Sequence, residues 1–130
     1  MVKKETSMKK LLLLLFLIPN LVMANEYLSL CKKQSEYMNK YLPRQIDHLT
    51  VLNKTYCVVS KGKLYFQFDH TILNPKKLPK NIKKRSKKEA KKTYCSREYR
   101  KSLNYWTYDF YYLNKNVKPL YSFSIDKSDC

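Results

Sequence analysis

The number and setting of its cysteines constrain the fold of this chain more than any other feature. The chain has four cysteines, Cys31, Cys57, Cys95 and Cys130. All four follow a segment typical of a secretory signal peptide, with Lys9 and Lys10 ahead of an apolar run over residues 11–18 and Ala24 at the cleavage position. An even number of cysteines in a small exported chain predicts a disulfide framework. Zinc binding is the alternative, but the sequence has no Cys-x-x-Cys pair and no closely spaced cysteine and histidine.

The signal sequence divides the chain into residues 1–24, which we expect to be removed after Ala24, and one domain over residues 25–130. The apolar run is shorter than the roughly 20 residues that span a bilayer, so we expect no transmembrane helix in the mature chain. Cys31 is a poor lipoprotein site, because Leu30 is large where a small residue is needed and Glu26 is charged. The sequence therefore predicts a periplasmic domain without a lipid anchor at Cys31.

The spacing of apolar residues predicts two helices and two hairpins. Apolar residues recur every three or four positions over residues 26–42, which is typical of an amphipathic helix. Over residues 46–72, side chains of the two faces of a strand alternate on both sides of Gly62, the only glycine of the chain, and this pattern predicts a hairpin. A second helix is expected over residues 79–102 and a second hairpin over residues 104–125. The predicted fold class is α+β in the order α-ββ-α-ββ, a small antiparallel sheet of about four strands packed by two helices and stapled by two disulfides.

Four cysteines allow three disulfide pairings. We favour Cys31 with Cys57 and Cys95 with Cys130, because each bond then joins a helix to a sheet element that is close in sequence. Helices on one face of one sheet would satisfy both bonds. In the chain-entropy model, loops of this size stabilise the fold by roughly 3–4 kcal/mol per bond.

The end of the chain resembles the α/β class of type II secretion pilotins, which are small periplasmic lipoproteins. The resemblance rests on Tyr94 and Cys95, the aromatic hairpin of residues 104–125 and the closing residues 126–130, and it covers only the second half of the chain. It implies a disulfide between Cys95 and Cys130 across a small antiparallel sheet. Pilotins carry their secretin by way of a lipid anchor, whereas we expect no lipid anchor at Cys31 of this chain, which also has an additional cysteine pair and a basic run.

The basic run over residues 76–92 holds ten basic residues and one acid, Glu89. After residue 24 the chain keeps 23 basic and nine acidic residues, so the charge excess of the mature domain is +14. A solvated helix face is one interpretation. Repulsion within so dense a run destabilises the folded chain, however. A binding role is therefore favoured, with a polyanion such as lipid A phosphates, anionic phospholipids or an acidic protein as the partner. The predicted partner-binding residues are Lys83, Lys84, Arg85, Lys87, Lys88, Lys91 and Lys92.

Catalysis has few candidate residues in this sequence. His48 and His70 are the only side chains with an ordinary pKa near neutrality, and with nearby lysines they make a ribonuclease-like enzyme the weakest of our hypotheses. A single glycine leaves no phosphate-binding loop, and bonded cysteines leave no thiol nucleophile. Tyr105 and Tyr111 are the tyrosines expected to be free to stack on a ligand. We expect no cofactor, no metal, no small-molecule substrate and no nucleic acid.

The sequence thus predicts a periplasmic binding or adaptor protein of the cell envelope, without enzymatic activity. It would bind an acidic protein or an anionic envelope surface through its lysine-rich helix. The main alternative is an inhibitor or immunity-type protein directed against an acidic envelope enzyme or toxin.

Overall fold

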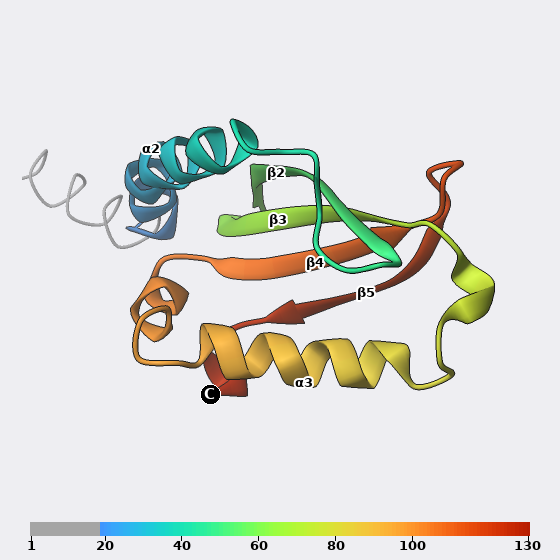
Figure 1. Cartoon of the computed structure of the whole chain (residues 1–130). Helices are drawn as coiled ribbons and strands as arrows, with labels where there is room; N and C mark the ends of the chain where they lie inside the picture. Colours follow the sequence, from blue (N-terminus) through green and yellow to red (C-terminus); the bar gives the residue numbers. More distant parts are fainter. Residues whose placement is uncertain (1–18) are drawn as a thin grey trace, which may run out of the picture.

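Two helices lie over one face of a five-stranded β-sheet in the computed structural model, which describes residues 19–130 (Figure 1). The elements in chain order are α2 (Pro19–Asn39), β1 (Arg44–Gln45), β2 (Thr50–Ser60), β3 (Lys63–Ile72), the 3₁₀ helix η1 (Pro75–Lys77), α3 (Ile82–Tyr94), η2 (Arg100–Asn104), β4 (Thr107–Leu113), β5 (Pro119–Ile125) and η3 (Lys127–Asp129). The α+β class, the element order and the two disulfides match the prediction.

The predicted signal peptide lies mostly outside the described residues. Its first 18 residues fall there, and positions 19–24 belong to the first turns of α2, which therefore begins earlier than predicted and ends at Asn39. Cleavage after Ala24 stays a prediction. No helix among residues 19–130 is long and apolar enough to cross a membrane.

The sheet is mixed, where the sequence predicted an antiparallel one. The strands follow each other in the order β1-β2-β3-β4-β5, and β3 pairs with β4 in parallel. The reason is the connection between these two strands: η1, α3 and η2 return the chain to the end where β3 began, and such a crossover makes neighbouring strands parallel. The fifth strand is β1, two residues long and too short to leave a pattern in the sequence.

The β2–β3 hairpin forms where it was predicted. Lys61 and Gly62 both have positive φ, 51° and 76°, between the paired residues Ser60 and Lys63. A two-residue turn with both angles positive matches the twist of the strands, and it favours glycine at its second position.

The core lies between the sheet and the two helices. Alternate residues of β3 point toward the helices and are buried: Leu64, Phe66, Phe68, His70 and Ile72. The neighbouring strands and the segment before β4 add Trp106, Tyr108, Phe110, Phe123 and Ile125. On the opposite face, Tyr56 donates a hydrogen bond to Asp69 at 2.8 Å and both side chains are only half-buried, so that face is polar.

Helix α2 is fixed to β2 by one disulfide and a polar network. Cys31 bonds Cys57. One and two turns further on, Ser35 Oγ and Asn39 Nδ2 each donate a hydrogen bond of 2.8 Å to the Thr55 carbonyl oxygen, and Asn39 Oδ1 accepts one of 2.8 Å from the Thr55 amide. These bonds satisfy polar groups that are otherwise costly to bury.

Helix α3 is shorter than predicted and less deeply packed. It ends at Tyr94, followed by Cys95 as its C-cap, and the remainder of the predicted helix forms a turn and η2. Ile82, Ser86 and Ala90 point to the sheet, but no residue of α3 is fully buried. The cause is its position along the edge strand β5, where only part of the helix can be covered (Figure 1).

Candidate functional site

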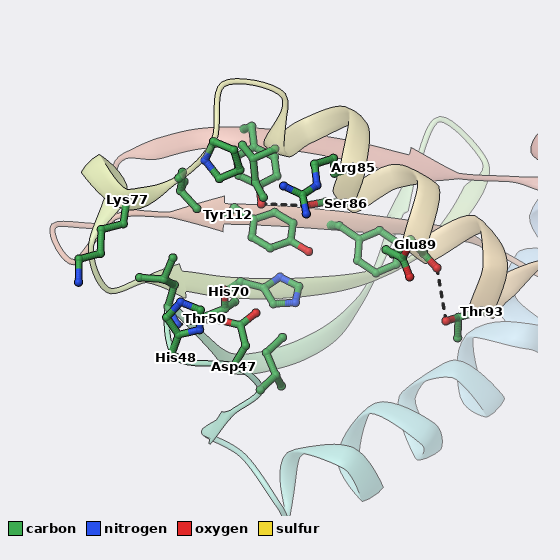
Figure 2. Close-up of a pocket in the computed structure, with 18 of the residues that line it drawn as sticks. Asp47, His48, Thr50, His70, Lys77, Arg85, Ser86, Glu89, Thr93 and Tyr112 are labelled. Atoms are coloured by element: carbon green, nitrogen blue, oxygen red, sulfur yellow. Dashed lines mark hydrogen bonds between the residues drawn. The ribbon is translucent and has the colours of Figure 1, made fainter.

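An open groove of about 660 Å³ runs over the sheet between α3 and the segment that joins β1 to β2 (Figure 2). Its floor consists of side chains from β3, β4 and β5: His70, Phe110, Tyr112 and Tyr121. One wall is the sheet-facing side of α3, from Ile82 to Thr93. The opposite rim is the segment 46–50, and residues 77–79 close one end.

Stacked rings form the floor because of the strand register. His70, Tyr112 and Tyr121 are direct neighbours across β3, β4 and β5. The His70 and Tyr112 ring centres lie 4.2 Å apart and the Tyr112 and Tyr121 centres 4.3 Å apart, with planes within 11° of parallel. The spacing between strands, about 4.8 Å, permits such stacking of flat rings. The result is a rigid aromatic surface at the bottom of the groove.

His70 is held in this stack in its neutral form. Its side chain is buried, and burial lowers the pKa of the imidazole below its usual value; the hydrogen bond to the Tyr111 carbonyl oxygen opposes this shift but does not cancel it. The Nδ1–H donates that bond, at 3.1 Å. Neutral His70 thus contributes an aromatic ring to the floor.

The state of His70 predicts a pH dependence of stability. An unfolded histidine titrates near pH ~6.5, so below this pH the unfolded chain binds more protons than the folded one, and the free energy of unfolding should fall as the pH drops further. Urea unfolding of His70→Phe, which keeps a ring but cannot titrate, should show a weaker decline between about pH 6.5 and 5. His48→Gln, which removes the other histidine of the groove from an exposed position, is the matched control. An unchanged decline in His70→Phe would refute this explanation.

Polar and charged groups line the rims above the aromatic floor (Figure 2). Ser86 Oγ of α3 and the Tyr121 hydroxyl share a hydrogen bond of 3.2 Å, which ties the helix to the floor. Arg85 and Glu89 lie one turn apart on the α3 wall, and Asp47 lies on the opposite rim. The groove thus offers donors and acceptors at its rims and apolar rings at its base, a composition that suits a peptide segment.

A second hollow of about 560 Å³ lies between α2 and α3, and Tyr94 lines both hollows. Its floor is Phe66, Phe68 and Tyr108, and Tyr37 and Met38 of α2 form its other wall. The two hollows together extend the aromatic surface from the β1–β2 segment to the C-terminal half of α2.

The structure divides the predicted partner-binding residues into two groups. Arg85 faces the groove. The others lie on the sides of α3 that do not face the groove, where Lys87 is half-buried and the rest are exposed: Lys83, Lys84, Lys88, Lys91 and Lys92. Lys87 forms an ion pair of 3.5 Å with Asp129, and Lys92 forms one of 3.2 Å with Glu89. Their role in binding stays a prediction.

The two histidines considered for catalysis, His48 and His70, both line the groove (Figure 2). The expectation for Tyr105 was wrong: its ring packs 4.4 Å from that of Tyr27 in α2, because Tyr105 precedes β4 and so does not follow the strand alternation. Tyr111 does lie on the open face of the sheet, half-buried. Within residues 19–130, no cluster of three or more His, Cys, Asp or Glu side chains could hold a metal ion.

Sequence reasoning missed most of the groove. Asp47, Glu89 and Thr93 line it but belong to no motif. The available signal was the alternation in residues 104–125, which has Tyr112 in register with Phe110 and Tyr121 in register with Phe123.

Comparison with solved structures shows that the fold is that of the α/β pilotins. A Pseudomonas aeruginosa protein described as secreted superposes with a TM-score of 0.69 at 14% identity, covering 83% of this chain and 96% of that one. The pilotin EpsS of the Vibrio vulnificus type 2 secretion system gives 0.65 at 10% identity, over 83% and 94% of the two chains. The type II secretion pilotin AspS of Vibrio cholerae gives 0.58 at 11% identity, over 83% and 95%. The resemblance therefore extends beyond the second half of the chain.

No protein-family model matches the sequence, and no curated protein does. At identities of 10–14%, the similarity to these structures establishes the fold alone.

Proposed function

We propose that this protein is an exported adaptor of the cell envelope that binds a protein partner of a secretion system. The observation that carries the proposal is the groove: on a pilotin fold, an aromatic floor with polar rims lies open between α3 and the β1–β2 segment. Aromatic side chains and arginine are the residues that most often dominate binding energy at protein interfaces. Arg85 and Lys77 in the groove lining can pair with acidic residues of a partner segment, and Asp47 and Glu89 can pair with basic ones.

Site-specific photo-crosslinking in cells tests this proposal. A photoreactive amino acid at His48 or Arg85, on the two rims, should yield one discrete crosslinked product that mass spectrometry identifies as an envelope protein. The same residue at Ser122, exposed on β5 and directed to the open face, is the matched control. Crosslinks from Ser122 alone, or from none of these positions, would contradict binding in the groove. A secretin as the product would assign a piloting role, and an enzyme or toxin would favour the inhibitor alternative.

A ribonuclease-like activity, the weakest hypothesis from the sequence, has one supporting observation, because the fold brings His48, His70 and Lys77 to one groove. Purified protein would then cleave RNA, and His48→Ala or His70→Ala would abolish cleavage. The buried, stacked ring of His70 argues against a proton-transfer role, so we expect no cleavage above the level of a His48→Ala, His70→Ala double variant.

A further inference from the structure

The side of α3 that faces away from the sheet consists of cations. Ser86 contacts Tyr121 on the sheet, and with 3.6 residues per turn the positions on the opposite side of the helix are Lys84, Lys88 and Lys91. All three lysines are exposed. No apolar side chain shares this side of the helix.

These three outward lysines lack partners within the described part of the chain. The ion pairs of α3 are those of Lys87 with Asp129 and Lys92 with Glu89, both on its flanks. Like charges four residues apart, such as Lys84 and Lys88, destabilise a helix unless counter-charges approach. Helix α3 lies along one margin of the molecule (Figure 1), and its outward side is a cationic surface without an ion-pair partner among the described residues.

We propose that the outward side of α3 docks electrostatically on an anionic lipid surface. A protein partner would be held by aromatic or apolar anchors in addition to charge, and this side of the helix offers none. A headgroup layer instead presents many diffuse phosphates, which the flexible ammonium groups of lysine engage without fixed geometry. Without apolar side chains to insert, binding is peripheral and sensitive to salt.

This docking leaves the groove accessible. The groove residues Ser86 and Glu89 lie on the sheet-facing side and flank of α3, whereas the outward lysines lie on the other side. The protein can thus bind a lipid surface through α3 and a protein partner in its groove at the same time. The inference does not depend on the proposed function, because it uses different residues.

Vesicle sedimentation tests the inference with purified residues 25–130. The chain should bind vesicles that contain phosphatidylglycerol, should not bind pure phosphatidylcholine, and should be released by added salt. Lys84→Glu, Lys88→Glu and Lys91→Glu together should lower the partition coefficient by at least about 100-fold. These substitutions leave both ion pairs of α3 intact, and circular dichroism verifies the fold.

The matched control carries Lys32→Glu, Lys63→Glu and Lys115→Glu, which change the net charge equally at exposed positions on other elements. It should retain most of its binding. Equal loss in both variants would show that net charge alone acts, and it would overturn the assignment to α3. Failure of the wild-type chain to bind the anionic vesicles would also overturn the inference. If the chain bound a polyglutamate peptide and no vesicles, the surface would be assigned to an acidic protein.

Discussion

Replacing Cys95 and Cys130 together by serine is expected to lower the free energy of unfolding by about 4 kcal/mol. The bond closes a separation of 35 residues, and in the chain-entropy model a loop of this length contributes roughly that amount. It matters particularly for α3, which contacts the edge strand β5 and has no fully buried residue. The bond joins the end of α3 to the last residue of the chain. Without this bond, repulsion among the lysines of α3 opposes the packing of the helix on β5. Few buried contacts then remain to offset the repulsion.

Hydrogen exchange distinguishes this local role from a general loss of stability. In Cys95→Ser, Cys130→Ser the amides of α3 should lose protection before those of β3. The matched control removes Cys31–Cys57, whose separation is 26 residues, and should cost a similar free energy while α3 keeps its relative protection. Equal protection of α3 in the two variants would contradict the role assigned to the Cys95–Cys130 bond.

Phe66→Ala should be the most destabilising single substitution in the sheet, at about 3–5 kcal/mol. Phe66 is 2% exposed, and its ring lies 5.1 Å from that of Phe68, 5.8 Å from Tyr108 and 5.9 Å from Trp106, centre to centre. Truncation removes this contact area and leaves a cavity in a close-packed core.

Tyr65→Ala is the matched control for Phe66→Ala. Tyr65 precedes Phe66 in β3 but points to the open face, where it is half-buried, so its truncation should cost only about 1 kcal/mol. Urea unfolding with intact disulfides measures both values. Comparable costs for the two substitutions would mean that the core does not lie on the helix-covered face.

The fold was largely predictable because its strongest determinants are local. Alternation around Gly62 and through residues 104–125 placed both hairpins, and each disulfide joins elements that are close in sequence. The parallel pairing of β3 and β4 was missed because it depends on where the chain returns after α3. Similarly, α3 was predicted to be too long, because helical spacing continues past Tyr94 whereas the bond at Cys95 and the following turn end the helix.

The groove was less predictable than the fold. Its rims come from the β1–β2 segment and from α3, and nothing in the pattern of Asp47 or Glu89 indicates that they share a site. The prediction concentrated on the density of lysines, which identified a charged surface. Of the predicted binding residues only Arg85 faces the groove, because the sheet-facing side of an edge helix carries few charges.

The most direct test of the central claim is the affinity of the crosslinked partner for a variant whose groove is blocked. Thr93 lines the groove and is exposed, so Thr93→Trp should fill the groove without disturbing the core. Isothermal titration calorimetry should show at least tenfold weaker binding, about 1.4 kcal/mol. Ser122→Trp, which adds the same ring to the open face, should bind as wild type. Unchanged affinity in Thr93→Trp, or an equal loss in Ser122→Trp, would contradict partner binding in the groove.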